Sequence, residues 1–328
     1  TVVYNINSEY SDVYSISFSD LTGDGVNEFI VLWDVISNSV NHVLYVYAQN
    51  LSGEYSLSPI GSELTVNNCI TVDMDLDTVN EMLAFTIESG DSVSSTATLY
   101  EYSLNGRETL GRTKLDGHIS YYSDIQYNVD EDRVYIYADA VKSDGTQMLT
   151  EVIYWSDYYD TIISPFYSYS NGTTSSTVRS SMISCDDVDD DGIIEIPTDV
   201  QMDDIPSDVK AVEWNTYNDS VLVTACYSLV VQKDQYQLII PDEYFDEIKV
   251  LYSPESSFLT VTDDNDNSLF SVMCVLKAHY NPSSSAYKGF SEIDESSGYV
   301  YLAQEGESGN ADFSVQSVKS MIRTDKGE

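Results

Sequence analysis

The chain has 328 residues, of which 55 are Asp or Glu and 14 are Lys or Arg, so its formal net charge at pH 7 is −41. A surface of this charge repels phosphate, which argues against a nucleic-acid partner and against docking on anionic lipid headgroups. Hydrophobic residues make up 42% of the chain, enough to build a buried core, and no apolar run is long enough to insert into a membrane. The surplus of carboxylates favours cations as ligands.

The first predicted elements are strands. Apolar and polar residues alternate with a period of two over residues 43–47, 97–102 and 133–137, which are rich in Tyr and β-branched residues. Turn dipeptides such as Asn105-Gly106 separate these runs at short intervals. The pattern predicts a mainly β chain, built as a sandwich, a barrel or a propeller.

An internal repeat favours the propeller. Three acidic segments, residues 20–28, 73–81 and 187–195, share one layout. Each lies between two short apolar runs that are expected to be strands, and the run before the third segment is residues 182–185. The distance in sequence from the second segment to the third is about twice the distance from the first to the second. We therefore expect a degenerate copy between the second and third segments, at residues 125–132. Strands that end in an aromatic residue recur with a similar period, at Tyr47, Tyr102, Trp155 and Trp214. A repeat of this size, with about four strands, is typical of one propeller blade.

The repeats predict two domains. Residues 1–231 are expected to form a β-propeller-like repeat domain with about four recognisable blades. From Gln232 the pattern changes, and residues 314–322 place apolar side chains on one helical face. Residues 232–328 are therefore expected to form a small α+β domain.

The acidic segments have the composition of cation-binding loops. Oxygen-bearing side chains occupy positions 1, 3, 5 and 9, and the apolar position 7 would offer its backbone carbonyl. Ca²⁺ takes about six to eight oxygen ligands, which such a loop supplies. The predicted metal ligands are Asp20, Thr22, Asp24, Val26 and Glu28 in the first loop, Asp73, Asp75, Asp77, Val79 and Glu81 in the second, and Asp187, Asp189, Asp191, Ile193 and Glu195 in the third.

Acidic turns have two other interpretations. An EF-hand is excluded, because position 12 holds Val31, Ala84 and Thr198 instead of Glu, and strands flank the loops. A solvated acidic turn is the simpler alternative for any single loop, because Asp and Asn are common in turns. Three copies at a regular period favour a metal, although Thr78 replaces the sharp-turn glycine of the other two loops.

The motif Phe18-x-Asp20-x-Thr22-Gly23-Asp24-Gly25-x-x-Glu28, followed by an apolar strand, resembles the FG-GAP/VCBS type of calcium-binding β-propeller repeat. The resemblance covers about residues 10–231, and the end of the chain resembles secreted or surface-anchored Gram-positive (Firmicutes-like) proteins. The resemblance to the FG-GAP/VCBS repeat implies about two or three structural Ca²⁺ ions, each between the first two strands of a blade. The Phe-Gly…Gly-Ala-Pro signature of that family is absent, and four units are fewer than its usual number of blades.

The cysteines and the start of the chain bear on location. The four cysteines, at positions 69, 185, 226 and 274, form no Cys-x-x-Cys pair, which argues against zinc and haem. Buried free thiols and disulfides are both compatible with them. The chain starts at Thr1, which suggests either a removed signal peptide or a trimmed end. With the resemblance, this predicts an extracellular protein, secreted or anchored at the cell surface.

Together these features predict a calcium-stabilised binding module for adhesion or for recognition of a protein or glycan ligand, without catalysis. Two alternatives remain open. One is a propeller-type carbohydrate-active enzyme that uses paired carboxylates. The other is a structural subunit of a surface assembly that pairs through exposed strand edges.

Overall fold

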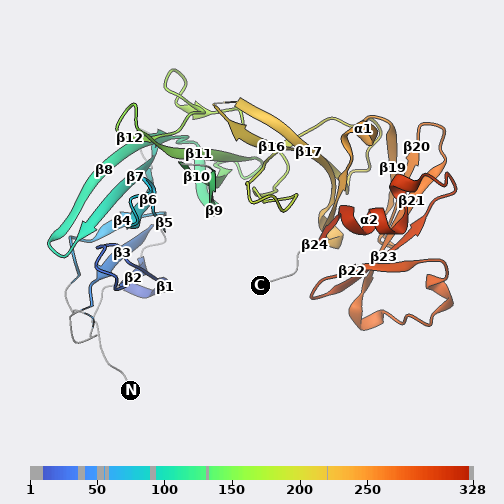
Figure 1. Ribbon diagram of the computed structural model, residues 1–328, viewed down its shortest axis with the longest axis horizontal. Coiled ribbons are helices and arrows are strands. Elements are labelled where there is room, and N and C mark those ends of the chain that lie inside the picture. Colours follow the sequence, from blue (N-terminus) through green and yellow to red (C-terminus); the bar gives the residue numbers. More distant parts are fainter. Residues whose placement is uncertain are drawn as a thin grey trace. The chain divides into compact units, whose positions relative to one another are not determined.

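The computed structural model describes residues 10–35, 41–49, 55, 59–88, 94–130, 133–219 and 221–324 (Figure 1). These residues fold mainly as small antiparallel sheets, which confirms the mainly β prediction. The chain divides into two compact units, Thr1–Ile194 and Glu195–Glu328. The helices in the described ranges are short, and none of them is both long and apolar enough to cross a bilayer.

In the described part of the first unit, three consecutive four-stranded sheets follow one another along the chain. The first contains β1 (Tyr10–Ser19), β2 (Glu28–Val35), β3 (His42–Tyr47) and β4 (Leu64–Val66). The second contains β5 (Asn68–Val72), β6 (Glu81–Glu88), β7 (Ser94–Ser103) and β8 (Gly106–Leu115). The third contains β9 (Ile119–Asp130), β10 (Arg133–Lys142), β11 (Met148–Ser156) and β12 (Thr161–Ile163). Each strand pairs with its neighbour in sequence, so every sheet is a meander (Figure 1).

Strand β6 shows why the sheets of this unit stack. Successive side chains of a strand point to opposite faces. Met82 and Ala84 lie in the core of the first sheet, with residues such as Ile30. Leu83 and Phe85 lie in a second core, which they share with residues of the third sheet. The continuous apolar run of β6 therefore reflects burial on both faces of the second sheet.

The described residues of the second unit form two five-stranded sheets. One has the order β15 (Ile196–Asp199), β16 (Lys210–Asn218), β17 (Val221–Val231), β18 (Tyr236–Ile240) and β24 (Ile322–Thr324). The other has the order β19 (Ile248–Ser253), β20 (Phe258–Asp263), β21 (Ser268–Leu276), β23 (Tyr299–Glu305) and β22 (Ser291–Glu295). The short helices α1 (Asp242–Phe245) and α2 (Val315–Met321) belong to the same unit.

The division between the two units lies at residue 194, whereas the predicted domain boundary, between residues 231 and 232, falls inside the second unit. The turn η1 (Gln232–Asp234) leads from β17 directly into β18, and the two strands pair over residues 227–231. Leu229 of β17 also shares one core with Leu259 and Val272 of the other sheet. Hydrophobic burial therefore joins the fourth predicted repeat to the C-terminal segment.

All four cysteines are free thiols, and Cys185, Cys226 and Cys274 are buried, so they pack as small hydrophobic side chains. The apolar run over residues 182–185, expected to be a strand, is not one. The degenerate repeat falls at the end of β9, and its last two residues, 131 and 132, lie outside the described ranges.

Candidate metal centres

The acidic loops lie at strand ends. Residues 20–27 join β1 to β2, and residues 73–80 join β5 to β6. The third loop leads directly into β15. In the third sheet the corresponding strands, β9 and β10, pair as far as Asp130 and Arg133, so only two residues of sequence separate them. The first two loops are thus additions to an otherwise simple β-hairpin.

The loops share a backbone conformation. Position 4 has a positive φ in each loop: 69° at Gly23, 61° at Leu76 and 64° at Asp190. Position 6 has one too: 82° at Gly25, 83° at Thr78 and 89° at Gly192. A β-branched residue rarely adopts a positive φ. Thr78 therefore keeps the shape of the glycine loops at the cost of local strain.

Carboxylates at positions 1 and 5 fold each loop around its own backbone. At position 1, a carboxylate oxygen accepts from the N–H of position 6, at 2.8 Å (Asp20 from Gly25), 2.9 Å (Asp73 from Thr78) and 2.9 Å (Asp187 from Gly192). At position 5, the carboxylate accepts from the N–H of position 7, at 2.9 Å (Asp24 from Val26), 2.8 Å (Asp77 from Val79) and 2.7 Å (Asp191 from Ile193). A carboxylate has about four acceptor positions, so these bonds leave room for a further ligand.

The glutamates at position 9 are buried. Glu28, Glu81 and Glu195 expose 1%, 2% and 0% of their surfaces. Glu28 and Glu81 each accept from the N–H of position 2, at 2.8 Å. Burial raises the pKa of Glu28, and burial together with repulsion from the neighbouring aspartates raises the pKa of Glu81 to about 8. A cation at these sites would stabilise the ionised form and lower both pKa values.

Positions 1, 3 and 9 come together. Carboxylate oxygens of Asp73, Asp75 and Glu81 all lie within 4.8 Å of one another, and so do those of Asp187, Asp189 and Glu195. The position-5 carboxylates, Asp77 and Asp191, belong to neither cluster, and each accepts a hydrogen bond from the N–H of position 7. The acids that meet are therefore the first, third and ninth residues of the second and third loops.

The first loop differs at position 3, where Thr22 replaces the aspartate. The Thr22 hydroxyl donates to Glu28 at 3.3 Å, which places it beside the position-9 carboxylate. Oδ1 of Asp20 is buried and has no hydrogen-bond partner. An unpaired buried carboxylate oxygen is costly, so the donor set of this loop fits a hard cation.

The first two loops also contact each other. The Asn80 side chain donates to the Ser19 hydroxyl at 2.9 Å, and the Asn80 N–H donates to the Asp20 carbonyl at 3.4 Å. Sequence reasoning did not single out Asn80. Its signal was the asparagine at position 8 of both loops, at Asn27 and Asn80.

Gly23 shows how closely these loops pack. A Cβ at Gly23 would lie 2.8 Å from Cγ2 of Val79, and its φ is 69°. We expect Gly23→Ala to lower the free energy of unfolding by about 2–4 kcal/mol, from steric overlap and backbone strain together. Gly145→Ala is the matched control, because its φ is 70° and nothing lies within 4 Å of its Cβ position. Equal losses in urea unfolding of the two variants would contradict loop-to-loop packing.

Asp116 and Glu151 are among the carboxylates that the first unit buries outside the loops. Oε1 of Glu151 accepts from the Asp116 N–H at 2.7 Å, and Asp116 pairs with Lys142 at 3.0 Å. Burial raises the pKa of Glu151 to about 7. Burial also acts to raise the pKa of Asp116, but hydrogen bonds, including those from Thr173 and Lys142, outweigh it and lower that pKa. Both residues are fully buried, so neither side chain is exposed at the surface to a substrate.

Glu151 predicts a pH dependence. Its pKa rises from 4.5 to about 7 on folding, so the folded protein keeps a proton that the unfolded chain releases. The contribution to stability is complete below pH 4.5 and is lost as the pH rises through about 7. We expect Glu151→Gln to flatten this part of the profile in chelator-treated protein. Urea unfolding between pH 4 and about 8 checks this, and an unchanged slope would refute it.

Comparison with known proteins adds little to this geometry. No protein-family profile and no curated protein matches the chain. Among solved structures, the chain is similar to MPT-1, a GDP-Man-dependent mannosyltransferase from Leishmania mexicana, at 9% identity, over 80% of this chain and 84% of that one. The TM-score is 0.33, so the similarity supports no inference about fold or activity.

Proposed function

We propose that this chain is an extracellular binding module whose β-sheets are stabilised by Ca²⁺ in the three acidic loops. The observation that carries the proposal is the meeting of positions 1, 3 and 9. The same positions converge in two loops that are more than 100 residues apart. Turns that serve only to reverse the chain have no need to bury a glutamate among aspartates.

The donor set favours Ca²⁺ over other metals. All candidate ligands are oxygens, which suit hard cations, whereas zinc and copper sites use His or Cys. Mg²⁺ demands near-ideal octahedral geometry and keeps several waters, while Ca²⁺ accepts irregular sets of carboxylates, hydroxyls and carbonyls. The Thr22 hydroxyl of the first loop and the carboxylates of the other two fit the more tolerant ion.

Each four-stranded sheet of the first unit is, in this proposal, one blade of a propeller-like array of the FG-GAP/VCBS type. Supporting this, the sheets are consecutive meanders, and the second has both faces buried. The acidic loops follow the first strand in the first two sheets. A cation there would tie the first strand of a blade to the second, and the module would present its ligand from a calcium-rigidified scaffold.

A thermal melt tests the proposal. Binding to the folded state alone stabilises by about 2.7 kcal/mol per site at a hundredfold excess over Kd, or roughly 5 °C per site. We expect millimolar Ca²⁺ to raise the Tm well above that in chelator. Mg²⁺ and Na⁺ at matched ionic strength control for screening of the negative surface. Equal Tm values in chelator, Ca²⁺ and Mg²⁺ would leave the loops as acidic turns.

A further inference from the structure

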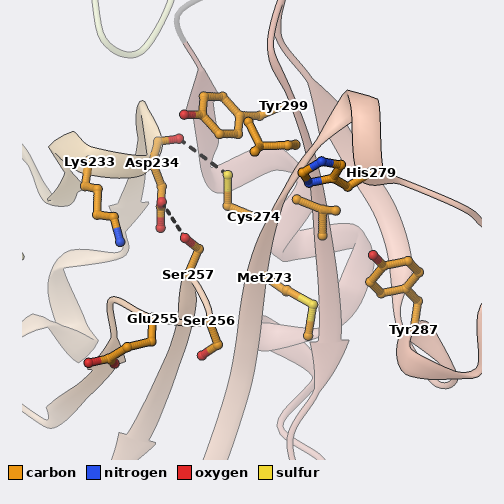
Figure 2. Close-up of a pocket in the computed structure, with 12 residues that line it drawn as sticks. Lys233, Asp234, Glu255, Ser256, Ser257, Met273, Cys274, His279, Tyr287 and Tyr299 are labelled. Atoms are coloured by element: carbon orange, nitrogen blue, oxygen red, sulfur yellow. Dashed lines mark hydrogen bonds between the residues drawn. The ribbon is translucent and has the colours of Figure 1, made fainter.

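The second unit contains a pocket of about 390 Å³ whose walls differ in chemistry (Figure 2). One wall is polar: Lys233 and Asp234 come from η1, and Ser257 from the turn between β19 and β20. Across the pocket lie Met273 of β21 and Tyr287 of η3 (Ser285–Tyr287), and His279 and Tyr299 extend this less polar wall (Figure 2). The volume lies within the range of small-ligand sites, about 300–1,000 Å³.

Asp234 is the fixed polar group of this pocket. Its side chain is buried, and its two carboxylate oxygens accept from the hydroxyls of Tyr252, at 2.7 Å, and Ser257, at 2.8 Å. The Tyr301 hydroxyl holds its backbone carbonyl at 3.0 Å. A carboxylate offers about four acceptor positions, so Asp234 can still accept hydrogen bonds from a ligand.

The backbone is strained at the residue that follows Asp234 and at Ser257, its hydrogen-bond partner. Gln235, which follows Asp234, has a φ of 56°, and Ser257 has a φ of 48°. Side chains other than glycine rarely adopt this conformation, and such residues cluster at ligand sites. The strain is therefore placed where it fixes the two hydrogen-bonding groups of the polar wall.

The thiol between the two walls is not a nucleophile. Cys274 is buried, and burial raises its pKa to about 12. Its Sγ donates to the Asp234 carbonyl at 3.7 Å. Since the reactive form of cysteine is the thiolate, Cys274 does not supply a nucleophile to this pocket.

The walls restrict the class of ligand. A wholly apolar ligand would bury Asp234 and Ser257 without a new partner. A cationic ligand would meet the Lys233 ammonium on the polar wall. An anionic ligand would meet two carboxylates, Asp234 and Glu255, on a chain of charge −41. A neutral ring with one C–H face and a rim of hydroxyls satisfies both walls at once.

We propose that this pocket binds a neutral hexopyranose, with its C–H face against the aromatic wall and its hydroxyls toward Asp234 and Ser257. The sugar is either free or the end of a glycan chain. The inference rests on the proposed function only in taking the chain as a binding module, because the pocket contains none of the acidic-loop residues.

Saturation-transfer NMR on the full chain tests this, with methyl glucoside, galactoside, mannoside and N-acetylglucosaminide as probes, followed by titration. We expect at least one probe to bind, Asp234→Asn to weaken it at least about tenfold, and Tyr287→Ala about fivefold. Asn can still accept from Tyr252, and Tyr287 lies at the protein surface, so either variant suffices if the other fails to fold. Asp264→Asn and Tyr158→Ala, which replace exposed residues outside the pocket, should bind as the unaltered chain does.

The outcomes separate the two proposals. Absence of transfer to every probe, or binding unchanged in both pocket variants, overturns the sugar site whatever the calcium melt shows. Sugar binding that persists in chelator, without stabilisation by Ca²⁺, overturns the cation sites alone. A disaccharide that binds more tightly than its methyl glycoside identifies a glycan chain as the source, and equal affinities identify the free sugar.

Discussion

Replacing Arg179 with alanine is expected to lower the free energy of unfolding by about 3–5 kcal/mol. The guanidinium is fully buried and lies 2.8 Å from Oδ1 of Asp139. It also donates to the Thr150 hydroxyl at 2.9 Å and to the Ile183 carbonyl at 2.7 Å. The substitution leaves a buried carboxylate without its cation, and the cost of that charge dominates the effect.

Urea unfolding in chelator measures this effect apart from any cation. Arg112→Ala is the control in the same unit, because Arg112 is exposed and should cost about 1 kcal/mol or less. A similar small loss for Arg179→Ala would contradict the role assigned to this pair. Asp139 also accepts from the Cys185 N–H at 2.7 Å, so the pair fixes the segment that enters the third acidic loop.

Replacing Glu81 with glutamine is expected to remove the calcium stabilisation of the second loop while changing the calcium-free protein little. In the absence of a cation, burial and, to a smaller extent, repulsion from the nearby aspartates raise the pKa of Glu81 to about 8. The side chain is therefore largely protonated at pH 7. Glutamine resembles that protonated form and can still accept from the Met74 N–H. With Ca²⁺ present, the variant lacks an anionic ligand and loses about 2.7 kcal/mol at a hundredfold excess of the ion over Kd.

The measurement is urea unfolding of the variant in Ca²⁺ and in chelator. Glu88→Gln is the matched control, since Glu88 ends the same strand and is exposed. Its loss should be small in both conditions. A loss for Glu81→Gln that is as large in chelator as in Ca²⁺ would mean that Glu81 serves the fold and not a cation.

The first two loops and their flanking strands could be predicted because their determinants are local. Alternation marks strands such as β3, β7 and β10, and the acidic residues at positions 1, 5 and 9 of the loops recur at fixed spacing. Which acids meet was not predictable in the same way. Asp77 and Asp75 are chemically alike, and only the folded backbone directs Asp77 to the Val79 N–H while Asp75 joins Asp73 and Glu81.

Features that depend on distant contacts were hidden for a different reason. Arg179 lies in a Ser- and Thr-rich stretch that is typical of an exposed loop, and nothing nearby in the sequence indicates its partner Asp139, 40 residues away. The division at residue 194 likewise depends on which strands share a hydrophobic core. Leu229 and Leu259 lie in the same core, although they are far apart in the pattern of repeats. The pocket of the second unit brings together η1, two turns and β21, segments with no shared motif.

Counting bound calcium tests the central claim most directly. After equilibrium dialysis in millimolar Ca²⁺, elemental analysis of the full chain should find at least two ions per chain, one for each carboxylate triad, and a third if the Asp20 loop is filled. Glu81→Gln should remove one ion and leave the others in place. A calcium content per chain no higher than that of the same protein dialysed against chelator would contradict the account.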